Sequence, residues 1–199
     1  MRRVAVALAL CVLIASNLWG SEVPAAQEKH PSVALVVAGK VNKAGVEAVQ
    51  LHLSRRLFVV VHVEKVKIAA GISADQAISQ IKATMKAGDL CAVCLGGDGC
   101  PWPRLSLVEE KQVAMIGVSA LKPPAGEKLD HTWMRRVRKE SVRAVCLMLG
   151  LKDCAFPRCA LLNTVNDTQL DDKGDTPCPP CYKSLQKIMK ERGLKPIYR

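Results

Sequence analysis

Two kinds of periodicity alternate along the first half of the chain. The runs 32–38 and 58–68 are rich in β-branched residues, and in the second run Val59, Val61 and Val63 share one face, which is typical of strands. Between these runs, apolar residues at 46, 49, 51 and 53 stand in a charged segment of helical character. The pattern therefore predicts a strand, a helix over 43–55 and a second strand.

A second helix is predicted from its start signal. Ser73 and Gln76 have the spacing of a capping box, and apolar residues recur behind them at helical spacing. We expect this helix to run to about Ala87. Two further strand candidates follow at 89–95 and 112–121. The order strand, helix, strand, helix, strand, strand predicts a mixed α/β sheet with helices packed on it.

One long helix is predicted over 130–149, and Gly150 ends it. Its inward stripe is expected to contain Met134, Val137, Ser141, Val145 and Met148. The rest of its surface is basic and carries Arg135, Arg136, Arg138, Lys139 and Arg143. Because exposed helix faces are usually charged, we interpret this basic surface as solvated. The alternative interpretation is that this basic surface binds phosphate or an anionic membrane surface.

The first twenty residues have the features of a secretory signal. An unbroken apolar run, 4–15, follows two arginines and precedes small and polar residues. We therefore expect 1–20 to be a signal peptide, 21–31 a linker and 32–199 a single domain. The protein would then be periplasmic or secreted, where disulfides persist. An uncleaved N-terminal anchor is the alternative, and membrane association is expected only through that segment.

The composition fits one modest globular domain. Of the 199 residues 49% are apolar and 24% charged, and no apolar run beyond the N-terminus approaches the roughly 20 residues of a membrane-spanning helix. The formal net charge of +11 falls by two, to +9, without the N-terminal arginines, and it favours anionic partners. We expect no nucleic acid partner, because the chain is predicted to be exported and its basic residues are not interleaved with aromatic ones. The glycine-rich turn at 96–99 lacks the Gly-Lys-Ser/Thr of a phosphate-binding loop.

Four cysteines near the C-terminus are spaced as two metal-binding hooks. Cys154 and Cys159 are separated by four residues, and Cys178 and Cys181 by two. Structural zinc is commonly held by four thiolates from two such pairs. We favour a zinc site here over two disulfides, which are the alternative in an exported protein. Either cross-link would stabilise a region that we expect to be too polar to hold itself by burial in the core.

The other cysteines and the histidines are interpreted as structural residues. Cys91, Cys94, Cys100 and Cys146 could form two disulfides, with three possible pairings. Cys91 and Cys94 are three apart on a predicted strand and therefore lie on opposite faces, and Cys146 is expected to be a small buried apolar residue. The four histidines, which we take as structural or surface residues, are scattered: His30, His52, His62 and His131.

The long helix and the cysteines together form a recognisable pattern. The helix ends in KESVRAVCLMLGLKDC at 139–154, and PRC at 157–159, DKG at 172–174 and CPPC at 178–181 follow. This resembles the archaemetzincins, a metzincin-like group of zinc metallopeptidases whose pattern is His-Glu-x-x-His-x-x-Gly-x-x-His, Cys-x4-Cys and a later Cys-x-x-Cys. The resemblance is good over 139–185, and weaker but order-preserving over 32–121. It implies a metzincin-like mixed sheet with packed helices, a long active-site helix and a C-terminal four-cysteine module that holds one structural zinc ion.

The resemblance does not extend to the catalytic residues of that family. Its three zinc-binding histidines correspond to Arg143, Leu147 and Asp153, and its general-base glutamate corresponds to Ala144. Gly150 matches the turn glycine, and the four cysteines match position by position. Catalytic zinc typically needs three protein donors, and alanine offers no acceptor for the proton of the attacking water. The resemblance therefore implies a pseudoenzyme with no catalytic residues.

Two of these positions suggest a specific contact. The first and third ligand positions of the family face one point, so we hypothesise that the Arg143 guanidinium pairs there with the Asp153 carboxylate while Leu147 fills the remaining gap. The alternative is that Arg143 simply extends the solvated stripe of Arg135 and Lys139.

The sequence thus predicts an exported, archaemetzincin-like pseudopeptidase that serves as a binding or scaffold protein. A peptide or protein would occupy its vestigial cleft, and one zinc ion would be held by Cys154, Cys159, Cys178 and Cys181. The competing prediction is a working zinc-dependent metallopeptidase that draws its catalytic ligands from elsewhere. Metal content distinguishes the two predictions. The pseudopeptidase would hold at most one zinc ion per chain, whereas the working metallopeptidase requires a second, catalytic zinc ion.

Overall fold

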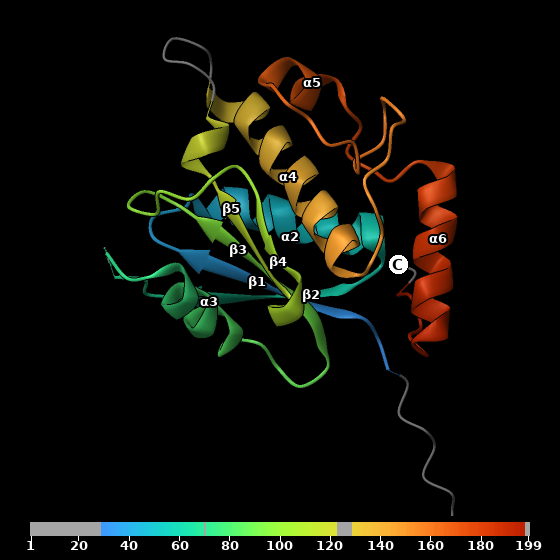
Figure 1. Cartoon of the computed structure of the whole chain (residues 1–199), viewed down its shortest axis with the longest axis horizontal. Coiled ribbons are helices and arrows are strands. Elements are labelled where there is room, and N and C mark those ends of the chain that lie inside the picture. The colour runs from blue at the N-terminus through green and yellow to red at the C-terminus, as the bar shows by residue number, and fades with distance from the viewer. Residues whose placement is uncertain (1–28, 70, 123–128, 198–199) are drawn as a thin grey trace, which may run out of the picture.

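Five strands form one mixed sheet in this computed structural model, which describes residues 29–69, 71–122 and 129–197 (Figure 1). The order across the sheet is β2-β1-β3-β5-β4. The strands are β1 (Ser32–Ala38), β2 (Val60–Val66), β3 (Asp89–Gly96), β4 (Ser106–Val108) and β5 (Val113–Gly117). All neighbouring pairs are parallel except β4 and β5, which are antiparallel. The predicted mixed sheet is therefore confirmed.

Helices cover both faces of this sheet (Figure 1). They are α2 (Lys43–Leu57), α3 (Ala74–Lys82), α4 (Leu129–Met148), α5 (Asp167–Asp172) and α6 (Pro179–Glu191). Helices α2 and α4 pack against each other and on one face, and α3 packs on the other. Two short 3-10 helices, Glu109–Lys111 and Ser119–Leu121, flank β5.

The pleat of the strands divides the core into two parts. Val33, Leu35 and Val37 of β1 face α2 and α4, whereas Ala34 and Val36 face α3. Burial on both faces is typical of parallel strands covered by helices on each side, and it explains the nearly unbroken apolar runs of β1 and β3.

Strands β1, β2 and β3 and helix α2 lie close to their predicted places, and α3 begins where predicted. The capping box is present, since Gln76 N donates to Ser73 Oγ at 3.2 Å and Ser73 N donates to Gln76 Oε1 at 3.1 Å. The prediction that α3 extends to Ala87 was wrong. The helix ends at Lys82, and Thr84 closes its last turn by donating from both its amide and its hydroxyl to the Ile81 carbonyl.

The prediction for the last parallel strand was too long, and one strand was missed. Strand β5 ends at Gly117 rather than at Leu121, and a Cβ at Gly117 would lie 2.1 Å from the Trp102 carbonyl oxygen. The chain therefore passes too close to the loop before β4 for any larger residue at that point. The edge strand β4 has only three residues, too few to show a period.

The C-terminal region contributes to the core, which corrects the expectation that it is too polar to do so. Helix α6 buries Leu185 and Met189 in the same core cluster as residues of α2, α4 and the sheet, and Leu194, after the helix, belongs to it as well. Two prolines in its first turn start this helix. The described residues contain no helix long and apolar enough to cross a membrane. The predicted signal peptide and most of the predicted linker lie outside the described residues.

Candidate metal centre

The four C-terminal cysteines converge on one point. Their sulfur atoms lie within 4.8 Å of one another, and Cys154 Sγ is 3.8 Å from Cys178 Sγ. Tetrahedral zinc with Zn–S bonds of about 2.3 Å places its sulfurs about 3.8 Å apart. The eight cysteines of the described residues are all free thiols. The spacing of the cluster and its four soft donors therefore fit a zinc ion.

Local structure explains why the sulfurs meet. Cys178 is the residue before α6, and Cys181 lies in the first turn of that helix, so the two share one end of it. Cys154 and Cys159 lie on a tight loop, in which the Cys159 amide donates to the Phe156 carbonyl and the Cys154 amide to the Leu161 carbonyl. The two hooks are joined where the Ala160 amide donates to the Thr176 carbonyl at 2.9 Å.

Glycine is required beside this junction. A Cβ at Gly174 would lie 2.1 Å from the Arg158 carbonyl oxygen, so only glycine lets the two chain segments approach this closely. The cysteine spacing alone does not show this requirement.

Backbone amides point at the sulfurs. Phe156 N donates to Cys154 Sγ at 3.4 Å, and Cys178 N donates to Cys159 Sγ at 3.3 Å. Burial raises the pKa of the Cys159 thiol and, with its neighbouring thiols, that of Cys181. Burial also opposes ionisation of Cys178, yet hydrogen bonds from the Cys181 backbone and from the other thiols lower its pKa overall. Because metal ligation deprotonates thiols, zinc binding is expected to release protons.

The remaining cysteines behave as small core residues. Cys91 faces α2 and α4, and Cys94 faces α3, which confirms that they lie on opposite faces. Burial raises the pKa of Cys91 to about 12, and it raises that of Cys146 as well. Cys146 is fully buried in the core, as predicted.

The predicted pair at the C-terminal end of α4 is present. Arg143 Nη2 donates to Asp153 Oδ1 at 2.8 Å and Nε to the same oxygen at 3.2 Å, while Nη1 lies 3.6 Å from Glu140 Oε2. The Arg143 side chain is 11% exposed, but that of Asp153 is 47% exposed. The contact is therefore a partly exposed ion pair in which Arg143 binds one oxygen of Asp153, rather than a fully buried pair that uses both oxygens. Leu147 is half-buried and Ala144 is fully buried.

A second and more deeply buried ion pair joins α4 to the residue that follows α5. Lys173 Nζ is 2.6 Å from Glu140 Oε1, with the two side chains 0% and 2% exposed. Lys173 also donates to the Leu162 carbonyl at 3.2 Å. Burial lowers the pKa of Lys173, and the Glu140 carboxylate opposes that shift. Neither residue was predicted to form an ion pair, although a charged residue one helical turn before Arg143 on a mostly buried helix indicated one.

The interpretation of the basic surface of α4 as solvated was wrong for two of its residues. Arg136 is 3% exposed and Lys139 is 2% exposed, because α5 and the loop after it cover them. Arg136 donates through Nε and Nη2 to the two carboxylate oxygens of Asp171, at 2.8 and 2.6 Å. Lys139 Nζ donates to the Leu170 and Asp171 carbonyls, and burial lowers its pKa to about 8.

The Asp171 contact gives a pH-dependent prediction. Hydrogen bonds from Arg136 hold the pKa of Asp171 below its ordinary value, so its contribution to stability is complete above about pH 4 and is lost as pH falls through the lowered pKa. We expect Asp171→Asn to reduce the free energy of unfolding at pH 7 by about 1 to 2 kcal/mol, an amount discounted because the side chain is one-third exposed. Urea unfolding at pH 7 and pH 3 measures this, and the deficit should shrink at pH 3. Asp172→Asn, at an exposed neighbour, is the control, and a deficit of equal size at both pH values would contradict the prediction.

Three solved structures share this architecture. The archaemetzincin from Methanopyrus kandleri has 20% sequence identity and a TM-score of 0.65, with 82% of this chain and 98% of that chain covered. The fold is that of the archaemetzincins. A zinc-dependent peptidase from Methanocorpusculum labreanum has 16% identity and a TM-score of 0.63, covering 77% and 99% of the two chains. The archaemetzincin from Archaeoglobus fulgidus, complexed with malonate, has 18% identity and a TM-score of 0.56, covering 76% and 98%.

This similarity is one of fold. No family model matches the chain, and no curated protein matches its sequence. Among the described residues, the four cysteines are also the single group of three or more histidine, cysteine or acidic side chains that lie close enough to share a metal ion. Two predictions are thus confirmed, the archaemetzincin-like fold and a cysteine cluster able to bind a metal.

Proposed function

We propose that this protein is an archaemetzincin-like pseudopeptidase whose four-cysteine cluster holds one structural zinc ion, and that it acts as a binding or scaffold protein. The observation that carries the proposal is the Arg143 guanidinium, whose Nη2 lies 2.8 Å from Asp153 Oδ1 at the C-terminal end of α4. By the sequence resemblance, this is where a peptidase of this fold would place a zinc-binding histidine.

The residues around Arg143 do not fit a catalytic metal. A guanidinium is permanently charged and cannot donate electrons to zinc, and it adds positive charge where the charge of the metal would be. Arg143 also lies between the Asp153 and Glu140 carboxylates, so the acidic groups nearest to it already have a cation. Ala144 offers no atom that accepts a proton. We therefore derive no hydrolytic step for this chain.

The structural zinc has a different role in the proposal. Cys178 directly precedes α6, Cys181 lies in its first turn and Cys154 follows α4, so one ion would tie these two helices together. We propose that this connection keeps α6 on the core while a peptide or protein is bound in the vestigial cleft. We also propose that the protein is exported and reaches its partner in the periplasm or outside the cell.

Metal content and peptide cleavage test the proposal together. We expect about one zinc per chain by elemental analysis, and no cleavage of unstructured casein above the rate of buffer alone, even with added zinc. A Cys159→Ser variant should bind no zinc and should be equally inactive. A second zinc ion that survives in Cys159→Ser, together with chelator-sensitive casein hydrolysis, would show instead a working zinc-dependent metallopeptidase.

A further inference from the structure

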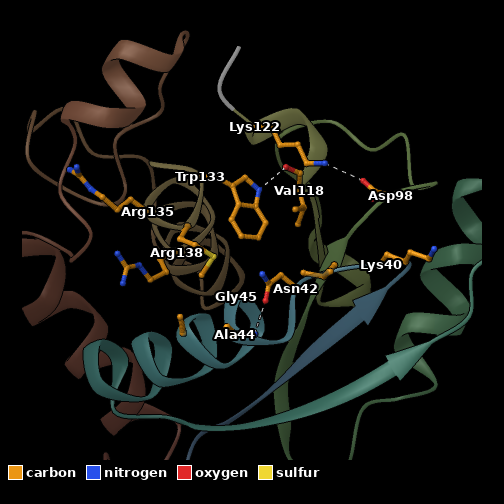
Figure 2. A pocket seen from close by; sticks show the side chains of 13 residues that line it. Lys40, Asn42, Ala44, Gly45, Asp98, Val118, Lys122, Trp133, Arg135 and Arg138 are labelled. Atoms are coloured by element: carbon orange, nitrogen blue, oxygen red, sulfur yellow. Dashed lines mark hydrogen bonds and ion pairs between the residues drawn. The ribbon is translucent and has the colours of Figure 1, made fainter. Parts of the chain in front are cut away.

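A separate hollow opens at the edge of the sheet where the parallel strands end (Figure 2). It has a volume of about 670 Å³, within the usual range for small-molecule sites. Its lining comes from the residues after β1, β3 and β5, from the first turns of α2 and from α4 between Trp133 and Arg138. Arg143 is ten residues beyond Trp133 on α4, about 15 Å along the helix axis. The lining of the hollow ends at Arg138, five residues before Arg143, and includes neither residue of the Arg143 pair and none of the four cysteines.

The topology of the sheet makes this position a favourable one for a ligand. Helix α2 connects β1 to β2 on one face, and α3 connects β2 to β3 on the opposite face. After β1 the chain runs to β2, and after β3 it runs to β4 and β5 on the other side, so the connections leave these neighbouring strands in opposite directions. In open sheets of this kind, ligands bind outside the carboxyl ends of the strands at such a switch point.

Glycines bring the two loops at the switch point into backbone contact. Gly97 N donates to the Ala38 carbonyl at 2.8 Å, and a Cβ on Gly97 would lie 2.2 Å from the Lys40 carbonyl oxygen. Lys40 and Asp98 form an isolated β-bridge as a result. The glycine-rich turn that lacked a phosphate-loop motif thus forms the rim of the hollow and fixes the backbone of Lys40 there.

One wall is apolar and held in place. The Trp133 indole Nε1 donates to the Val118 carbonyl at 3.2 Å, which fixes the ring against the hollow (Figure 2). A Cβ on Gly45 would lie 3.2 Å from the Trp133 ring and 3.1 Å from the Met134 sulfur, so glycine lets α2 and α4 close on this ring. A bound molecule would meet a preformed aromatic and aliphatic surface.

The charged residues around the hollow are nearly all positive. Lys40 and Lys122 lie on one side of Trp133, and Arg135 and Arg138 on the other (Figure 2). Asp98 is the one acidic residue in the lining, and Lys122 already pairs with it at 3.2 Å. The first turn of α2 carries no acidic residue to balance the positive end of its dipole.

We propose that this hollow binds a small organic phosphate. Its phosphate group would be held by Lys40, Lys122 and the amino end of α2, and its apolar part would lie along Trp133. A dianionic group balances several cations at once, and phosphate oxygens suit both lysine ammonium groups and helix amino ends. The site does not depend on whether the protein is a pseudopeptidase, because it uses none of the residues assigned to that function.

Isothermal titration calorimetry of the zinc-loaded protein with phenyl phosphate tests the site. We expect saturable binding of one molecule per chain, at least about tenfold tighter than that of inorganic phosphate because of the apolar wall, and no binding of phenol. The double variant Lys40→Gln/Lys122→Gln should weaken phenyl phosphate binding by at least about tenfold. Binding should also weaken as salt is added.

The matched control is Lys183→Gln/Lys190→Gln, which removes the same charge from exposed positions on α6. This variant should bind phenyl phosphate as the native protein does. Absence of saturable binding to the native protein would overturn the proposal, as would equal weakening in both double variants. Equal affinities for phenyl phosphate and inorganic phosphate would overturn the assignment of an organic ligand.

Discussion

Substituting Cys159 by serine is expected to remove the zinc ion and to lower the free energy of unfolding by more than about 3 kcal/mol. Structural zinc sites bind with apparent free energies of about 10 to 16 kcal/mol in small peptides, and that energy is available to the folded state alone. Here the ion would join the end of α4 to the start of α6, and α6 buries Leu185 and Met189 in the main core. Loss of the ion should therefore reduce the stability of the whole domain as well as of its last helix.

Elemental analysis and thermal unfolding of the two proteins measure this effect. Cys100→Ala is the matched control, because Cys100 is also buried but lies in the core beneath α3, outside the zinc cluster. It should retain its zinc. A Cys159→Ser protein with full zinc content and an unchanged unfolding midpoint would contradict the prediction. Four oxidised sulfurs and no zinc in the native protein would instead support two disulfides.

Replacing Lys173 by methionine is expected to destabilise the protein by about 3 to 5 kcal/mol. The change leaves the Glu140 carboxylate buried at 2% exposure, with the Arg143 Nη1 atom still 3.6 Å away. Breaking one side of a buried ion pair costs this much because the remaining charge is desolvated without its partner. Replacing both residues, as Glu140→Leu/Lys173→Met, should recover most of the loss, since neither charge then has to leave water.

Denaturant unfolding of the two single variants and the double variant gives the coupling energy directly. Lys187→Met provides the control, because the Lys187–Glu191 pair has side chains that are 78% and 61% exposed. That change should alter the free energy of unfolding by less than about 1 kcal/mol. Additive losses in the double variant would mean that Glu140 and Lys173 are stabilised by separate neighbours rather than by each other.

Local sequence patterns predicted much of the fold. The β-branched runs at β1 and β2 and the capping box at Ser73 each depend on contacts within a few residues, so they can be read without knowing the tertiary structure. Strand β4 was missed because three residues do not establish a period. Helix α6 was overlooked although its signals were present, with prolines in the first turn and Leu185, Ile188 and Met189 on one face.

The errors on α4 have a common cause. Its apolar stripe predicted one buried face, but α5 and the loop before α6 cover a second face that carries Arg136, Lys139 and Glu140. Such a face looks solvated in the sequence because charged residues are usually exposed. Here the partners of these side chains, the Asp171 carboxylate, two backbone carbonyls and the Lys173 ammonium, come from a segment about thirty residues further along the chain.

The sequence alone determined the order along the chain of four of the strands and of α2, α3 and α4, the spacing of the four cysteines and the side chains present along α4. Those properties are local or are fixed by residue identity. The tertiary structure decided that the four sulfurs meet, that Lys173 reaches Glu140, and that Trp133 and the glycine-rich turn line one hollow. These arrangements depend on contacts between distant segments, and their geometry is set by packing against the whole core, which no short window of sequence contains.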